Sequence, residues 1–133
     1  MLRYLFNALL LSWVFIAPTQ DAMAQQIDGN ELYSACQSEN GVMQGFCIGY
    51  IIGAIENQPF GAYIALMPAQ MWETTEEANR VISVFLKHCT PENASNEQLR
   101  DIVLKHLRTF PEQRHNTARG LVWDALVASF PCE

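Results

Sequence analysis

The chain has 133 residues, half of them hydrophobic, and 14 acidic residues against eight Lys and Arg give it a net charge of −6. An acidic balance argues against a nucleic-acid or anionic-membrane partner and permits a basic protein partner. The length fits one domain, and no internal repeat, low-complexity segment or Gly/Ser linker divides it.

The first 24 residues have the three parts of a secretory signal peptide. Arg3 lies in a short basic start, an apolar run covers Tyr4–Ala17, and Ala22–Ala24 matches the A-x-A cleavage pattern. A membrane anchor is the alternative, but the run is shorter than the ~20 residues that a bilayer crossing needs. We expect residues 1–24 to be removed and residues 25–133 to be exported into a compartment where disulfides form.

Four cysteines remain after this cleavage, namely Cys36, Cys47, Cys89 and Cys132. An even number of cysteines in a small exported chain predicts two disulfides, with three connectivities. A zinc site would favour Cys pairs about two to four residues apart. The successive gaps here are 11, 42 and 43 residues, so we expect disulfides and neither a metal nor a cofactor.

Helical signals begin directly after the leader. Asp28 and Glu31 have the spacing of a capping box, which predicts a short helix through about Gln37 and then a turn. A second helix is expected from about Val42 to Asn57, because Pro59 should bar its continuation.

Three more helices are predicted by apolar stripes with helical spacing. Thr74 and Glu77 form another capping box, and the helix after it should end at Thr90-Pro91. Ser95 opens the next helix, and Pro111 fits the first turn of the last one. The three stripes are Ala78, Val81, Ile82, Phe85, Leu86 and Cys89; Leu99, Ile102, Val103, His106, Leu107 and Phe110; and Ala118, Leu121, Val122, Ala125 and Leu126. Strand-like alternation is absent, so the sequence predicts an all-α, disulfide-stapled bundle of about five helices.

The order of these helices indicates how the cysteines pair. Cys36 closes the first helix and Cys47 opens the second, so a hairpin brings them to the same end. Cys89 closes the third long helix, and the next two helices leave that end and return to it with Cys132. An up-down arrangement therefore favours Cys36–Cys47 and Cys89–Cys132.

Gly45, Gly49 and Gly53 repeat every four residues within the second predicted helix. Each should cost about 1 kcal/mol relative to Ala, so an interaction should offset them. The ordinary interpretation is that another helix of the same chain packs closely on this smooth face. The alternative is the seam of a homodimer.

Residues 58–73 form a proline-bounded segment that is rich in Met and aromatic side chains. One interpretation is a short core-packing helix with its connection. The functional one is a protruding loop in which Met67, Met71 and Trp72 anchor a protein partner, because Trp and Met are enriched at the centres of interfaces. Trp123 falls within the last helix, where we expect a core position.

Catalytic signals are weak. His106 lies on an apolar stripe, where a hydrogen-bonded core histidine is the ordinary interpretation, and His88 and His115 sit beside charged residues at helix ends and are expected to be solvated. The sequence lacks a nucleophile elbow, a zinc-protease motif and a glycine-rich phosphate loop. Paired cysteines leave no free thiol as a nucleophile. We therefore expect a binding protein rather than an enzyme, although scattered carboxylates could still meet in three dimensions.

Several fragments in order resemble one known family. They are Phe46-Cys47-x-Gly49-Tyr50-Ile51-x-Gly53; Cys89-x-Pro91-x-x-x-Ser95-x-x-Gln98-Leu99-Arg100-Asp101-x-Val103; His106-Leu107 with Phe110-Pro111-Glu112; and Ala125-Leu126 with Phe130-Pro131-Cys132. Together they resemble the Rap/Tai immunity proteins of type VI secretion systems, from about Glu31 to Cys132.

The resemblance implies a small helical, disulfide-bonded periplasmic protein that is often dimeric. Its characterised members bind and block a peptidoglycan-cleaving amidase by occupying the cleft of its active site. The family signature consists of fold residues, so it transfers no binding residue to this chain. The alternative function is a periplasmic binding or acid-stress chaperone-like module on the same scaffold, without a toxin partner.

Overall fold

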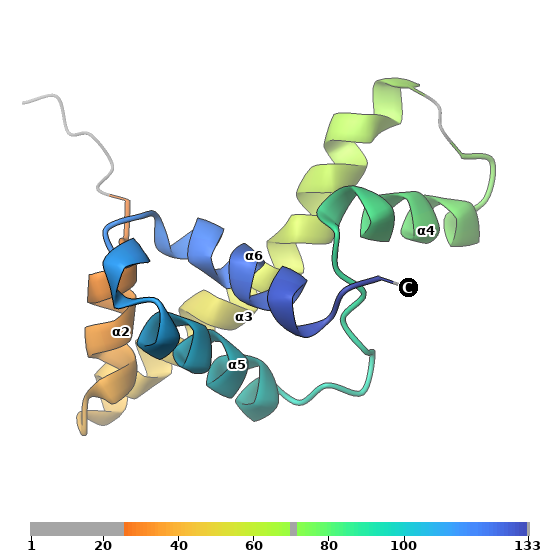
Figure 1. The fold of residues 1–133 in the computed structure, drawn as a ribbon. Coiled ribbons are helices and arrows are strands. Elements are labelled where there is room, and N and C mark those ends of the chain that lie inside the picture. Colours follow the sequence, from red (N-terminus) through yellow and green to blue (C-terminus); the bar gives the residue numbers. More distant parts are fainter. Residues whose placement is uncertain (1–25, 70–71, 133) are drawn as a thin grey trace, which may run out of the picture.

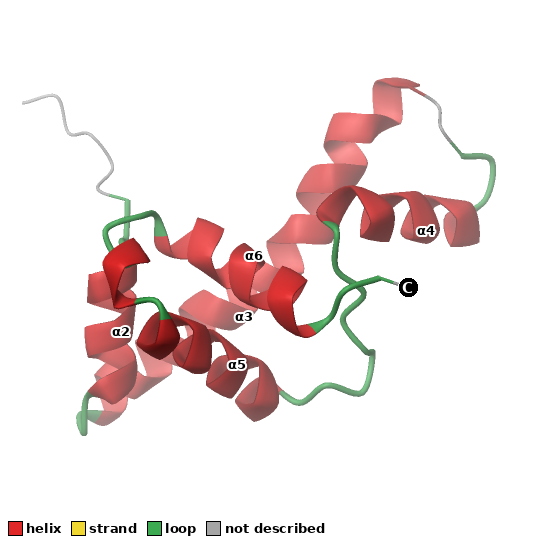
Figure 2. Ribbon diagram, viewed as in Figure 1, coloured by secondary structure: helices red, strands yellow, loops and turns green. Residues whose placement is uncertain are grey.

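A computed structural model describes residues 26–69 and 72–132, and Figure 2 shows that these residues form helices joined by loops. The helices are α2 (Gly29–Gln37), α3 (Gly41–Leu66), α4 (Thr75–Leu86), α5 (Asn96–Thr109) and α6 (Ala118–Ser129), with short 3-10 helices η1 (Met67–Ala69) and η2 (Pro111–Gln113). The predicted all-α class is confirmed. The leader, residues 1–24, lies outside the described residues. In the described part of the chain, no helix is long and apolar enough to cross a membrane.

Three of the predicted helix starts are confirmed by their caps. The Asp28 carboxylate accepts the Glu31 amide proton at 2.8 Å, and the Glu31 side chain accepts the Asp28 amide proton at 3.1 Å. Thr74 forms the same reciprocal box with Glu77, and the Ser95 hydroxyl accepts the Gln98 amide proton. These side chains satisfy donors that lack a partner within the helix, which is why each helix begins where it does.

The predicted end of α3 is wrong. The helix passes through Pro59 and continues to Leu66. A proline in a helix interior removes one backbone hydrogen bond, here the one to the Ile55 carbonyl, and strains the preceding turn. Packing of the second half of α3 against α4, with Ala62 buried, offsets this cost.

Two other boundaries differ from the prediction. Helix α4 ends at Leu86 because Lys87 adopts a left-handed backbone conformation, with φ of 61°, and its amide bonds to the Val84 carbonyl. Cys89 therefore lies in the connection and not on the helix. Pro111 opens the short helix η2, and α6 begins only at Ala118.

The helices form two parts, which Figure 1 shows side by side. The body consists of α2, the first half of α3, α5 and α6, which pack on one another. The arm consists of residues 58–69 and 72–86, so it contains the second half of α3, η1 and α4, and it projects from the body. The core lies in the body, and its largest fully buried side chains are Leu32, Ile51, Leu107, Leu121, Leu126, Val103 and Val122.

Both predicted disulfides are confirmed. Cys36 is bonded to Cys47 and joins the end of α2 to α3, while Cys89 is bonded to Cys132 and joins the base of the arm to the C-terminal segment. The Cys89 amide also donates to the Phe130 carbonyl at 2.8 Å. The second bridge therefore ties the arm to the end of α6.

Candidate interaction surface

Exposed apolar side chains gather on the arm. Ten large apolar side chains of the described residues are exposed, and six of them belong to the arm, namely Phe60, Tyr63, Ile64, Met67, Val84 and Phe85. Three others, Val42, Met43 and Phe46, lie at the start of α3. A contiguous apolar patch on a soluble protein commonly marks an interaction site, so the arm is the first candidate.

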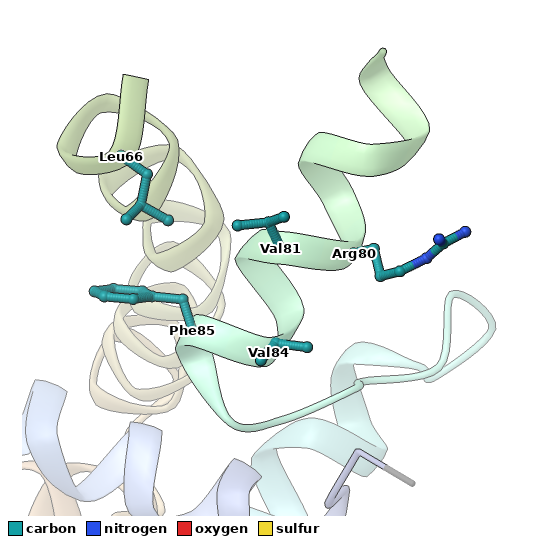
Figure 3. A pocket seen from close by; sticks show the side chains of 5 residues that line it. All are labelled: Leu66, Arg80, Val81, Val84 and Phe85. Atoms are coloured by element: carbon teal, nitrogen blue, oxygen red, sulfur yellow. The ribbon is translucent and has the colours of Figure 1, made fainter. Parts of the chain in front are cut away.

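A groove of about 390 Å³ lies on the arm, lined by Leu66 of α3 and by Arg80, Val81, Val84 and Phe85 of α4. Figure 3 shows Leu66, Val81 and Phe85 pointing into the space between the two helices, while Arg80 extends on the opposite side of α4. Val84 is 67% exposed and Phe85 is 54% exposed. The groove therefore offers an apolar floor with one cationic side chain at its margin.

The sequence does not reveal this groove, because an apolar stripe on one helix is ordinarily the side that faces the core. Ala78 and Ile82 are indeed buried, but Phe85 is exposed. The apolar face of α4 is wider than the predicted stripe, and this width is the signal that some of its apolar positions are exposed. Val84 is apolar but lies off the predicted stripe, so α4 has more apolar surface than one contact with α3 can cover.

The segment predicted as a protruding loop is helical in its first part. Met67 lies in η1 and is 44% exposed. Trp72 is half-buried, with its ring 5.5 Å from the Tyr63 ring between centroids. Met71 lies outside the described residues. Of the predicted anchors, Met67 is therefore an exposed side chain on the arm surface. Trp72 is half-buried and also packs against the arm itself.

The base of the arm contains a histidine whose predicted solvation is wrong. His88 is only 6% exposed. Its Nε2 lies 2.9 Å from the Gln58 Oε1 and its Nδ1 lies 3.1 Å from the Thr90 Oγ1. Burial lowers the pKa of His88, because the charged imidazolium loses its hydration. The sequence neighbours of a residue do not reveal whether a distant helix covers it.

His106 is partly buried, as its place on the α5 stripe suggested, and its ring lies 4.9 Å from that of Phe110. Its Nε2 has no hydrogen-bond partner among the described residues, so the predicted hydrogen bond is not found at that atom. Burial lowers the pKa of His106, and the Asp124 carboxylate partly opposes this shift. His115 is exposed, as predicted.

The glycine face of α3 is open. A Cβ built on Gly45, Gly49 or Gly53 would meet no atom within 4 Å in the described part of the chain beyond its own helix backbone and immediate neighbours. The predicted packing of another helix of the same chain on this face is therefore wrong. The helices that bury α3 lie against its other side, where Cys47 and Ile51 point into the core.

A second groove, of about 690 Å³, lies where α2 meets the start of α3. It is lined by Ile27, Asn30, Glu31, Ser34, Val42, Met43 and Phe46. Val42 and Phe46 lie on the same side of α3 as Gly45 and Gly49 at helical spacing. This groove and the glycine face therefore form one surface along α3.

Comparison with known protein families decides the classification. The family model of the Rap1a immunity proteins matches residues 28–132, which include both disulfides, the body and the arm. The chain belongs to the Rap1a immunity protein family. No curated protein matches the chain, and no solved structure matches it either.

In this Rap1a-family chain the acidic and basic residues are unevenly distributed along the sequence. Between Arg3 and Arg80 it contains no Lys or Arg, although seven acidic residues lie between Gln26 and Asn79. The seven Lys and Arg from Arg80 onward lie instead in α4, α5, α6 and the connections beside them. Within residues 26–69 and 72–132, no group of three or more His, Cys, Asp or Glu side chains could hold a metal ion. Residues 26–79, which include α2 and α3, thus carry a net negative charge.

Proposed function

We propose that this protein is a periplasmic immunity protein that binds and blocks a peptidoglycan-cleaving amidase effector of a type VI secretion system. The observation that carries the proposal is the match of the Rap1a immunity family over residues 28–132. The ordered motifs around the cysteines support the amidase and the secretion system as the context. The signal-peptide pattern of residues 1–24 and the two disulfides support an exported, oxidising location.

In this proposal the protein inhibits the effector by binding it through an exposed surface. The arm projects from a disulfide-braced body and carries most of the exposed apolar side chains of the described chain. A projecting helical pair of this kind fits a concave partner such as the cleft of an enzyme, and a rigid body lowers the entropy lost on binding. Met67 and Trp72 at the end of the arm remain the proposed anchors, and Met71 stays with them as a sequence-based expectation.

We also propose that two copies pair through α3. The open face with Gly45, Gly49 and Gly53 would let two α3 helices approach closely, and Val42 and Phe46 would add apolar contacts beside it. Sedimentation velocity of the wild type and of Gly49→Leu is the test. A dimer in both proteins would place the seam elsewhere on the molecule.

The function is tested with the purified mature protein and an amidase effector of a type VI secretion system, taken from the neighbouring genes where one is encoded there. Digestion of isolated peptidoglycan by the effector should fall linearly as the protein is added and stop near one binding site per effector. Absence of binding and inhibition would contradict the proposal. Protection of unrelated unfolding proteins at acidic pH would instead support the chaperone-like alternative.

A further inference from the structure

We propose that the Cys89–Cys132 disulfide is a redox-sensitive latch of the arm. A thiol reductant opens this bridge while the protein stays folded and while Cys36–Cys47 stays closed. Opening releases the base of the arm from the end of α6, and reoxidation fastens it again. The latch requires no effector, so it stands apart from the proposed immunity function.

The two disulfides differ in how far a reductant can reach their sulfur atoms. Cys47 is 1% exposed and belongs to the hydrophobic core, and Cys36 is partly buried against that core. Cys89 is exposed, and Cys132 is only partly buried. A thiolate opens a disulfide by attacking one of its sulfur atoms, so the rate depends on access to that atom. Attack on Cys89 is therefore the least hindered.

The sulfur atoms that leave also differ between the two bridges. Attack on Cys36 would expel the Cys47 thiolate into apolar surroundings, where its charge is poorly hydrated. Attack on Cys89 expels the thiolate of Cys132, which is partly exposed and meets water. A thiolate that forms more easily leaves faster. Access and leaving group thus both favour opening of Cys89–Cys132.

A small polar pocket beside Cys36–Cys47 does not change this order. The pocket has a volume of about 270 Å³, and its lining includes Arg100 and Asp101. A cation beside a disulfide can stabilise the thiolate that leaves. Here the Arg100 guanidinium already pairs with the Asp101 carboxylate at 2.8 Å. The pair therefore offers little free positive charge to offset the burial of Cys47.

The contacts around the latch explain why its opening loosens the arm. Helix α4 packs mainly on α3. Its end is joined to α6 and the following segment by the bridge, by the Trp123 indole that donates to the last carbonyl of α4, and by the Cys89 amide that donates to the Phe130 carbonyl. The Cys132 Sγ also lies 3.7 Å from the Ser83 carbonyl oxygen of α4. Residues 131–132 have no regular structure, so without the bridge Cys132 can move away from α4.

The chemistry is a thiol–disulfide exchange with a dithiol as the reductant. One thiolate of the dithiol attacks the Cys89 Sγ, the bond to Cys132 breaks, and the Cys132 thiolate takes up a proton. The second sulfur of the dithiol then attacks the first and displaces Cys89, which also takes up a proton. The dithiol ends as a disulfide, and its two protons and two electrons reside on Cys89 and Cys132.

Limited reduction of the folded protein tests the selectivity. The mature wild-type protein is treated with dithiothreitol at neutral pH, free thiols are trapped with iodoacetamide, and peptide mapping identifies the alkylated cysteines. We expect Cys89 and Cys132 to be alkylated about tenfold faster, or more, than Cys36 and Cys47. In urea, where burial no longer protects Cys47, we expect the two bridges to open at similar rates.

Hydrogen exchange of the partly reduced protein tests the release of the arm. With Cys89–Cys132 open and Cys36–Cys47 closed, amides of α4 should exchange faster, while those of α2 keep their protection. Reoxidation with glutathione disulfide should restore the slow exchange of α4. The matched control replaces both Cys89 and Cys132 by Ser. In this variant the same dose of dithiothreitol should leave the exchange of α4 unchanged, because the latch is already absent.

Each outcome bears on a different part of the proposal. Opening of Cys36–Cys47 first, or of both bridges together, in the folded protein would overturn the selectivity, and so would resistance of both bridges to dithiothreitol. A selectivity that persists in urea would overturn burial as its cause. Selective opening with unchanged exchange of α4 would overturn the latch.

Discussion

Among single residues, His88 makes two of the polar contacts at the base of the arm. The Gln58 Oε1 accepts hydrogen bonds, so the His88 Nε2 carries the proton of this 2.9 Å contact. The Nδ1 of the neutral ring then accepts the Thr90 hydroxyl proton at 3.1 Å. Both nitrogens of the neutral ring are thereby satisfied without water. The neutral form thus joins α3 to the connection that begins after α4.

This arrangement predicts a pH-dependent stability. Burial lowers the folded-state pKa of His88 below its ordinary value of 6.5, so the unfolded chain takes up a proton first as the pH falls. The free energy of unfolding should be full above about pH 6.5 and decline below it, down to the folded-state pKa. His88→Gln should remove part of this decline in urea titrations between about pH 7.5 and pH 5.

His106 supplies the internal comparison for this measurement. Its pKa is also lowered by burial, so His106→Gln should remove another share of the same decline. His115→Gln, at an exposed position, should leave the pH profile unchanged. A profile for His88→Gln that is identical to that of the wild type would show that the buried contacts of His88 do not survive in solution.

Substitutions of the two described tryptophans should separate effects on effector binding from effects on fold stability. The Trp123 indole N–H donates to the Leu86 carbonyl at 2.8 Å and joins α6 to the end of α4, so Trp123→Ala should mainly lower the melting temperature. Trp72 packs on Tyr63 near the end of the arm. Trp72→Ala should weaken effector binding by roughly 2–4 kcal/mol, with a smaller loss of stability. Unfolding of Trp72→Ala would place this residue in the arm's own core.

At the scale of single elements, the sequence predicts helix starts better than helix ends. Asp28, Thr74 and Ser95 cap their helices through contacts within a few residues, so local spacing is enough to find them. The continuation of α3 through Pro59 depends on α4, which packs against it from a distant part of the chain. The left-handed Lys87 that ends α4 has no comparable local signal, because glycine is the usual residue there.

Two glycines should respond in opposite ways to the same substitution. Gly49 lies mid-helix on the open face of α3, so Gly49→Ala should raise the free energy of unfolding by about 1 kcal/mol through helix propensity. At Gly29 a Cβ would overlap the Leu121 side chain and lie 2.9 Å from the Arg114 carbonyl oxygen. Gly29→Ala should therefore destabilise the protein. Urea titration of both variants at dilute concentration, where pairing of copies does not contribute, measures the contrast. A loss of stability in Gly49→Ala would show that this face is covered.

At the scale of the whole molecule, the candidate surface arises from tertiary structure. Met67 and Trp72 could be singled out from the sequence because a proline-bounded run of Met and aromatic residues is unusual. The groove of Leu66, Val81 and Phe85 could not, because Val81 and Phe85 fit a core stripe when α4 is considered alone, and because Pro59 predicts a helix end before Leu66. The two disulfides followed from the order of helices, since that order brings the cysteine-bearing ends together.

The two disulfides should stabilise different parts of the molecule, one the body and the other the base of the arm. In the chain-entropy model, the bridge with a separation of 11 residues and that with 43 residues contribute about 3 and about 4 kcal/mol, respectively. Replacing Cys89 and Cys132 by Ala should therefore cost slightly more than replacing Cys36 and Cys47, apart from the cavity left at buried Cys47.

Hydrogen exchange should show which helices lose stability when each disulfide is removed. Removal of Cys89–Cys132 frees the base of the arm, so amides of α4 should exchange faster while those of α2 and α5 keep their protection. Removal of Cys36–Cys47 should instead speed exchange at the junction of α2 and α3. If α4 exchange is unchanged without Cys89–Cys132, then the bonds of His88 and Trp123 are enough to hold the arm. The arm would then keep its position in a reducing environment as well.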